Sequence, residues 1–221
     1  MNLILELSKK FKNNISHNVE LSNYSWFNLG GPAEHLFKPY NKEQLVQFLE
    51  INKKNNLNIT ILGAGSNTLI RDKGIKGVVI KLGSNFSNIN LTDNNTIEVG
   101  AATLDRKIAN FAKENGIGNL EFLSCIPGSI GGAVIMNSGC YGNDISKVLV
   151  SINVIDTYSG KEKEIKRKDI NFFYRGTNLA NHLIITSVKL KGIKTDKVLI
   201  EKKQKKFIEE KKLSQPSQIN T

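Results

Sequence analysis

Apolar and polar residues alternate along the first half of the chain in short blocks that predict one β-α-β-β unit. Residues 58–62 and 78–82 have the length and apolar character of buried strands, and residues 34–39 also predict a strand. Residues 41–52 have apolar positions at helical spacing, and Asn41 is a suitable N-cap. We therefore expect a helix between the first strand and the other two.

The second half of the chain also predicts both helices and strands, in a different order. Residues 105–115 form an amphipathic pattern that Gly116 ends, which predicts a helix with a glycine at its C-terminus. Residues 148–156 and 162–165 predict a hairpin, and residues 183–190 are a clear strand pattern. Three further elements complete the prediction: an N-terminal helix over residues 2–12, a strand over 96–99 and a charged helix over 202–212.

A glycine-dense stretch, residues 120–142, fits neither pattern. It is apolar, so it does not resemble a flexible linker, and it has too many glycines for a core strand. One interpretation is a buried turn system; the other, which we favour, is a loop whose main chain lies against a ligand and whose N–H groups converge on an anion. The glycines concerned are Gly128, Gly131, Gly132, Gly139 and Gly142.

A second glycine turn, residues 63–67, follows the predicted strand at 58–62. A Rossmann fingerprint requires a third glycine where Thr68 stands, and the turn at residues 72–74 leaves no room for its helix. The chain has no P-loop sequence either. Two interpretations remain open, a plain turn at a strand end and a phosphate cradle made of N–H groups with the Ser66 and Asn67 side chains.

Composition narrows the classes of function. The 221-residue chain carries a formal net charge of +11, but most of its cations are lysines spread along the sequence, and it contains no zinc-finger, RRM or helix-turn-helix pattern. A solvated surface with affinity for small anions explains this charge better than nucleic-acid binding does. Cys125 and Cys140 have no metal-ligand spacing, so we expect no metal site. The chain has no apolar run of membrane-spanning length and no secretory signal, and we expect a cytoplasmic protein.

Several separate motifs resemble the UDP-N-acetylenolpyruvoylglucosamine reductase family in order and spacing. The resemblance covers about residues 20 to 220. The motifs that carry it are Trp26-Phe-Asn-Leu-Gly-Gly-Pro-Ala33, Leu62-Gly-Ala-Gly-Ser-Asn67, Leu120-Glu-Phe122, Ile126-Pro-Gly-Ser-Ile-Gly-Gly-Ala133, Met136-Asn-Ser-Gly139 and Phe173-Tyr-Arg175.

The resemblance implies an α+β fold in which two subdomains clasp FAD, the fold of vanillyl-alcohol oxidase and p-cresol methylhydroxylase. It divides the chain into an N-terminal helix and lead-in (1–21), a first FAD-binding subdomain (22–84), a second (85–194) and the start of a third, substrate-binding domain (195–221). In the family, the serine that donates a proton and the catalytic glutamate belong to the sequence that follows Gln215-Pro216-Ser217. The resemblance therefore implies a C-terminally truncated form that lacks both groups.

The implied reaction uses FAD and NADPH to reduce the enolpyruvyl group of a UDP-sugar in peptidoglycan precursor synthesis. Arg175 matches the family's catalytic arginine, which stabilises the enolate of the substrate, and Tyr174 is expected beside it as a substrate contact. Cys125 stands where the family has glycine. The residues implied to bind FAD are Gly63, Ala64, Gly65, Ser66, Asn67, Ile126, Pro127, Gly128, Ser129, Gly131, Gly132, Ala133, Asn137 and Gly139.

Three other functions stay open at this point. The chain is alternatively another FAD-dependent oxidase of the same fold, a flavin-binding remnant without turnover, or a basic module for an acidic partner. Oxidases of this fold often attach FAD through His or Cys, and His17, His35 and His182 lie outside the glycine turns, which disfavours attachment through histidine. We expect a monomer that binds a UDP-sugar enolpyruvyl substrate and neither nucleic acid nor a membrane.

Overall fold

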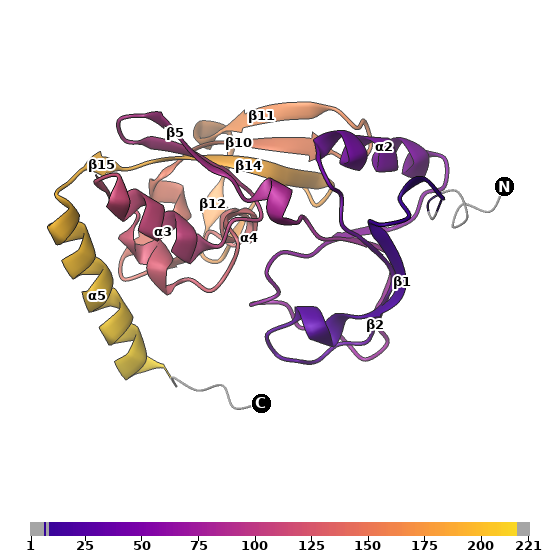
Figure 1. Ribbon diagram of the computed structural model, residues 1–221, viewed down its shortest axis with the longest axis horizontal. Helices are drawn as coiled ribbons and strands as arrows, with labels where there is room; N and C mark the ends of the chain where they lie inside the picture. The colour runs from indigo at the N-terminus through magenta and orange to yellow at the C-terminus, as the bar shows by residue number, and fades with distance from the viewer. Residues whose placement is uncertain (1–6, 8, 216–221) are drawn as a thin grey trace.

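The computed structural model describes residue 7 and residues 9–215, and it contains two main β-sheets. The first sheet belongs to the N-terminal part of the chain, and α5 lies at the opposite end of the molecule (Figure 1). The four strands of the first sheet, in the spatial order β1-β2-β4-β3, are β1 (Ile15–Glu20), β2 (Pro32–Phe37), β3 (Ile59–Ile61) and β4 (Ile75–Ile80).

The first sheet mixes both pairing directions because a helix crosses over between β2 and β3. β4 pairs in parallel with β2 and β3, whereas β1 pairs antiparallel with β2. The crossover helix α2 (Lys42–Lys53) begins at Asn41, whose side chain accepts a hydrogen bond from the Gln44 N–H. The predicted β-α-β-β unit is therefore confirmed, and β1, expected as part of a lead-in, adds an edge strand to it.

The second sheet is antiparallel throughout, in the order β11-β10-β14-β6-β5. The predicted strand at 183–190 becomes its central strand, and the predicted hairpin forms its edge. Its strands are β5 (Ile89–Asp93), β6 (Thr96–Gly100), β10 (Leu149–Asp156), β11 (Glu162–Lys166) and β14 (Leu183–Lys191). Three two-residue pairs flank it: β7 (Ile117–Gly118) with β15 (Ile193–Lys194), β8 (Gly139–Cys140) with β9 (Asn143–Asp144), and β12 (Phe172–Phe173) with β13 (Gly176–Thr177).

The helices α3 and α4 share one core with the second sheet, and α5 packs beside them. The helix α5 extends beyond the charged segment 202–212 over which it was predicted. Its Phe207 belongs to the same hydrophobic core as residues of α3 and α4. The Gln204 side chain donates a hydrogen bond to the Ala109 carbonyl at 2.9 Å, which ties α5 to α3 beside the second sheet. The helices are α3 (Asp105–Glu114), α4 (Ile130–Ile135) and α5 (Lys197–Ser214), with short 3₁₀ turns η1 (Leu21–Tyr24), η2 (Ser84–Phe86), η3 (Glu121–Cys125), η4 (Ile145–Lys147) and η5 (Arg167–Asp169).

The cores of the two sheets meet. Successive residues of a strand point to opposite faces, so Val78 and Ile80 pack under α2 while Val79 joins a smaller cluster on the other face. Ile155 of β10 and Ile184 of β14 are buried in the cluster under α2. This shared packing fixes the two sheets beside one another and leaves their open ends to form a cleft.

The structure leaves two sequence predictions untested. Most of the helix expected over residues 2–12 lies outside the described residues. The division into subdomains stays a prediction, although the two sheets use residues 15–80 and 89–191.

A histidine pair joins β1 to β2. The Nδ1 atoms of His17 and His35 are 2.8 Å apart, and the rings meet edge to face. A short contact between two ring nitrogens needs one of them to be unprotonated. Burial, opposed in part by Glu34 and assisted by His17, lowers the pKa of His35 below the ordinary value of 6.5.

We predict that the protein loses stability in mild acid through this pair. A histidine with a depressed folded-state pKa contributes stability that is present above about pH 6.5 and is lost as the pH falls, with a slope of at most about 1.4 kcal/mol per pH unit. Urea unfolding at several pH values measures the slope. His35→Gln, which cannot titrate, should show a shallower slope, and an unchanged slope would contradict this account.

Candidate functional site

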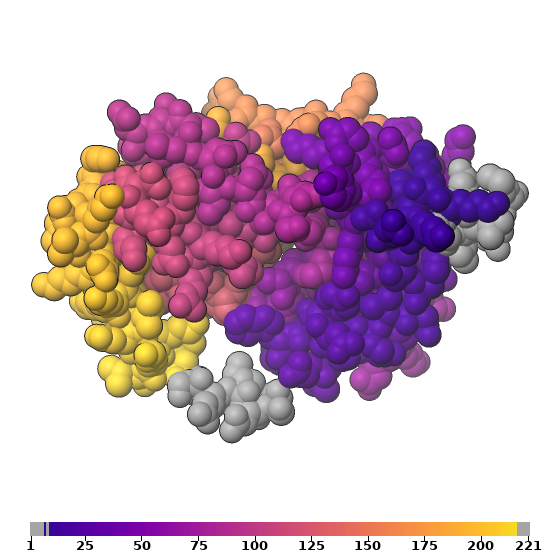
Figure 2. Space-filling view, in the orientation of Figure 1, coloured from indigo at the N-terminus to yellow at the C-terminus, as the bar shows by residue number. Residues whose placement is uncertain are grey.

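A cleft of about 1120 Å³ opens between the two sheets, and segments far apart in the sequence line it. The molecular surface is hollowed between the N-terminal part and α5 (Figure 2). Residues 59–68 of the first unit lie on one wall, and residues 125–133 and 138–141 of the second unit lie on the other. Three cationic side chains, Lys81, Arg175 and Lys211, also line it. The cleft is therefore roomy and electropositive.

The glycine turn after β3 requires a glycine at position 65. Gly65 has φ = +73°, and a Cβ at this position would lie 1.9 Å from the Tyr24 carbonyl oxygen. The Gly65 carbonyl accepts a hydrogen bond from the Trp26 N–H at 3.0 Å. This close approach of two main chains fixes the turn against the segment that precedes β2. Together with the positive φ, it explains why position 65 is a glycine.

The second glycine turn is fixed in the same way against the connection between β6 and α3. The Gly128 carbonyl accepts from the Asp105 N–H at 3.0 Å, and the N–H groups of Ile130 and Gly131 donate to carbonyls of residues 103 and 101 at 2.9 Å. Residues 130–135, expected as part of a ligand-contacting loop, form the short helix α4. The segment before α4 therefore keeps the loop conformation that was expected, while Gly131, Gly132 and Ala133 line the cleft from within α4.

The two turns face each other across a narrow gap. A Cβ on Gly63 would lie 3.1 Å from the Ser129 Oγ, and a Cβ on Gly128 would lie 3.7 Å from the Ser66 Oγ. Within the described part of the chain, the N–H groups of Ser66, Asn67 and Gly128 make no hydrogen bond to a protein acceptor. The structure thus brings together two turns with unused N–H donors, which is the chemistry of an anion cradle.

Two ionisable side chains support these turns. Lys81, which follows β4, donates a hydrogen bond to the Gly63 carbonyl, and burial together with Lys38 lowers its pKa. Asp105 begins α3 and is fully buried behind Gly128, and burial raises its pKa to about 8. Sequence reasoning missed both residues. Lys81 gave a weak signal, because it is a lysine inside an apolar strand pattern. Asp105 gave none, because an acidic residue in the first turn of a helix is common.

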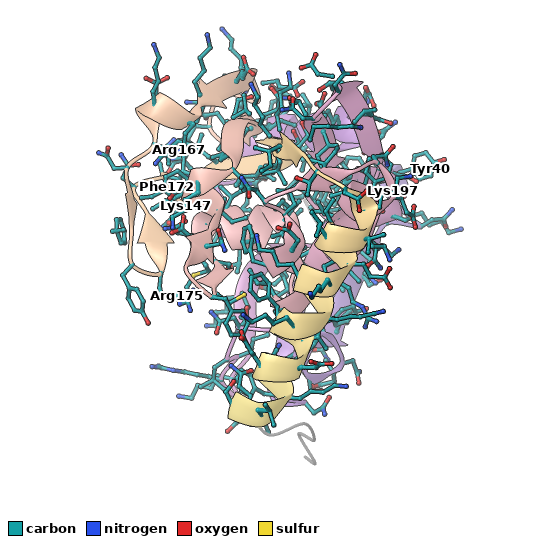
Figure 3. The ribbon with its side chains drawn as sticks, turned by 90° about the vertical axis from the view of Figure 1, so that its left-hand side faces the viewer. Tyr40, Lys147, Arg167, Phe172, Arg175 and Lys197 are labelled. Carbon is teal, nitrogen blue, oxygen red and sulfur yellow. The ribbon has the colours of Figure 1, made fainter. Side chains whose placement is uncertain are left out.

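Arg175 enters the cleft from the tip of the β12–β13 pair (Figure 3). It has φ = +58°, its Nη1 donates to the Gly139 carbonyl at 3.2 Å, and its guanidinium lies 5.4 Å from the centre of the Tyr174 ring. The predicted catalytic arginine is thus next to the predicted glycine segment, although 36 residues separate the two in sequence.

Two predicted site residues lie apart from the cleft wall. Tyr174 is 89% exposed and is not among the lining residues. Asn137 has a structural role: its side chain accepts from the Ser146 N–H at 3.1 Å and donates to the Phe173 carbonyl at 3.3 Å. The other predicted residues line the cleft, namely Gly63, Ala64, Gly65, Ser66, Asn67, Ile126, Pro127, Gly128, Ser129, Gly131, Gly132, Ala133 and Gly139.

Side chains from the C-terminal helix complete the wall. Lys211 of α5 donates to the Cys125 carbonyl at 2.8 Å, and Phe207 stacks on Tyr141 with ring centres 4.9 Å apart. Burial, with a further contribution from Cys125, raises the pKa of Cys140 to about 12, so this thiol is protonated and unreactive at neutral pH. Both cysteines line the cleft.

Among the described residues, no three His, Cys, Asp or Glu side chains are placed to hold a metal ion together. None of the helices in the described part of the chain combines the length and the apolar character that a membrane crossing requires.

The fold and the glycine-lined cleft define an FAD-binding flavoprotein. A family model described as an FAD binding domain matches residues 33–166. p-Cresol methylhydroxylase, at 14% identity and with a TM-score of 0.59 over 88% of this chain and 44% of its own, shares the fold. The predicted fold class is confirmed.

The chain belongs to the UDP-N-acetylenolpyruvoylglucosamine reductase family. It is 43% identical to the reductase of Pelagibacter ubique over 98% of this chain and 72% of the relative. It is 40% identical to that of a Wolbachia strain from Culex pipiens, over 90% of this chain and 67% of the relative. The crystal structure of the Thermus caldophilus reductase matches with a TM-score of 0.79 at 30% identity, over 90% of this chain and 70% of that one.

Membership confirms the predicted class of enzyme, an FAD-dependent, NADPH-linked oxidoreductase of peptidoglycan precursor synthesis. The chain spans between 53% and 72% of the length of the curated relatives it matches.

We predict that Gly65→Ala removes the first turn and with it the affinity for FAD. The new Cβ would combine a positive φ with a clash against the Tyr24 carbonyl, so the unfolding free energy should fall by more than about 3 kcal/mol. Chemical denaturation and FAD titration measure the two effects.

Gly142→Ala is the matched control for this variant. Gly142 has nearly the same φ, +74°, but a Cβ there meets nothing within 4 Å. It should lose only about 1 kcal/mol and keep its FAD affinity. Equal losses for the two variants would contradict the importance of the close approach at Gly65.

Proposed function

We propose that the two facing turns hold the diphosphate of FAD. The observation that carries this proposal is the set of unused N–H donors on Ser66, Asn67 and Gly128 in turns that face each other. The missing side chains at Gly63 and Gly128 let the Ser129 and Ser66 hydroxyls come close to the opposite turn, so that hydroxyls and N–H groups converge on one point of the cleft. The residues present therefore fit the cofactor, and the cleft volume suits a dinucleotide.

Lys81 and Arg175 set the charge of the cleft around this cradle. Lys81 donates to the Gly63 carbonyl, so its cation lies behind the first turn and favours an anion in front of it. Arg175 lies on the second wall, at Gly139. The two cations support an arrangement in which the diphosphate end and the reacting end of the cleft are both electropositive.

Arg175 is the proposed catalytic residue. When bound, the flavin supplies the hydride chemistry of the reaction, and the enolpyruvyl group gains negative charge on its carboxylate side as it is reduced. A guanidinium is always cationic, and it binds a carboxylate through two parallel hydrogen bonds. Its backbone and its bond to the Gly139 carbonyl hold it ready for this role.

Tyr174 is proposed as a substrate contact beside Arg175. Its ring is largely exposed and already lies against the guanidinium, so a UDP-sugar entering from that side would meet it first. Asn137 is proposed to act on the cofactor only through the loop it braces, because both ends of its amide bind protein atoms.

The 221-residue chain is proposed to keep the FAD site and the oxidation of NADPH, and to be slow in reducing the enolpyruvyl substrate. The buried Asp105 is the only carboxylic acid among the described cleft-lining residues, and it lies behind Gly128 at the diphosphate end. Among the described residues, the reacting end thus has a cation to stabilise an enolate but no carboxylic acid to protonate it.

The setting of this activity is also a proposal. We infer a cytoplasmic monomer with no nucleic-acid partner, because NADPH and nucleotide sugars are soluble anions and because the lysines are spread along the chain. Steep salt dependence of binding to duplex DNA would contradict this part.

We predict that the purified chain binds FAD and that NADPH bleaches its flavin absorption under anaerobic conditions. Arg175→Lys keeps a charge but loses the planar fork, so it should bind FAD within about threefold of the parent and be reduced by NADPH at a similar rate. Reoxidation of the reduced flavin by the enolpyruvyl substrate should slow by about 10²-fold or more. A variant that loses FAD instead would place Arg175 in cofactor binding.

A further inference from the structure

A buried carboxyl group lies directly behind the second glycine turn. Asp105 is 0% exposed, and its main-chain N–H donates to the Gly128 carbonyl at 3.0 Å. Its Oδ2 lies 3.2 Å from the point that a Cβ on Gly128 would occupy. The carboxyl group therefore lies in the cleft wall, packed against Gly128.

This carboxyl group has no partner. Neither of its oxygens makes a hydrogen bond, and the nearby Thr103 hydroxyl, also fully buried, makes none either. A buried carboxylate without partners is costly, whereas the neutral acid is tolerated and can donate one hydrogen bond. The geometry thus favours the protonated form.

Surrounding charges do not change this preference. Arg106 and Lys107 on α3 are exposed, and Glu121 of η3 is paired with Lys203 of α5. The turn at 63–67 and the segment 126–129 contain no ionisable side chain. The remaining cations on the cleft wall are Lys81, Arg175 and Lys211. None of these groups contributes to the raised pKa of Asp105, which has burial as its only cause.

Ionisation of Asp105 would act on the cradle in two ways. It would put a negative charge next to Gly128, close to the position proposed for the diphosphate. It would also draw the carboxylate toward N–H groups or water, away from its packed position against Gly128. Both effects oppose an anion in the cleft. The same coupling works in reverse, since a bound anion makes it harder to ionise Asp105.

We propose that Asp105 is a positioning residue that must carry a proton for FAD to bind tightly, so that FAD binding and deprotonation of Asp105 oppose each other. This inference rests on the proposed position of the diphosphate between the two turns. It gives the flavin site a built-in response to alkaline pH. It also predicts that FAD binding takes up a proton when the free protein has Asp105 ionised.

FAD titrations followed by flavin fluorescence, from about pH 6 to about pH 9.5, test the proposal. The dissociation constant of the parent should be constant at low pH and rise by up to about tenfold per pH unit above the pKa of Asp105. Asp105→Asn keeps the shape and stays neutral, so its dissociation constant should be flat over this range. Asp93→Asn, an exposed residue of β5, is the matched control and should follow the parent.

Calorimetry of the parent protein provides a test that needs no variant. Binding enthalpies in buffers with different ionisation enthalpies give the number of protons taken up, which should approach one at about pH 9 and zero at about pH 6. A parent with no proton uptake, or an Asp105→Asn protein with the parental pH profile, would overturn the proposal, and so would a profile changed equally by Asp93→Asn.

Ser66→Ala separates this inference from the function on which it rests. If the diphosphate lies between the turns, where the Ser66 hydroxyl as well as its N–H would donate to it, loss of the hydroxyl should weaken FAD binding by about tenfold at every pH. No weakening would overturn the proposed position of the diphosphate. Weakening without any difference in pH profile between the parent and Asp105→Asn would overturn only the role of Asp105.

Discussion

The close approach of main chain to main chain at two glycine turns is the constraint on which this structure depends. Gly65 lies against Tyr24, and Gly128 is hydrogen-bonded to the first residue of α3. A side chain at position 65 would collide with the Tyr24 carbonyl, and one at position 128 would press on the Asp105 carboxyl group. Because each turn is tied to its own sheet and the sheets share a core through Ile155 and Ile184, the turns face each other across one cleft.

The ionisable residues around the cleft belong to the same design. Lys81 supports the first turn and Asp105 the second, and burial pushes both toward their neutral forms. Arg175 differs from them because a guanidinium keeps its charge in any such setting. The permanent guanidinium charge is thus at the proposed reacting end, whereas Asp105, whose pKa burial raises to about 8, lies behind the second turn.

Much of this arrangement could be predicted from the sequence, for identifiable reasons. Strands such as β14 and helices such as α2 follow from apolar periodicity and an N-cap, and glycine density marked both turns. The helix α4 was missed because its glycines weaken helix propensity, and tertiary hydrogen bonds to residues 101 and 103 overcome this. The roles of Asp105 and Lys81 behind the two turns could not be predicted, because the burial of these side chains depends on segments that are distant in the sequence.

A crystal structure of this chain with FAD would test the central claim most directly. The claim predicts phosphate oxygens between the turns, at about 2.7–3.2 Å from the main-chain nitrogens of Ser66 and Gly128. A diphosphate bound elsewhere in the cleft, with these nitrogens left to water, would contradict it.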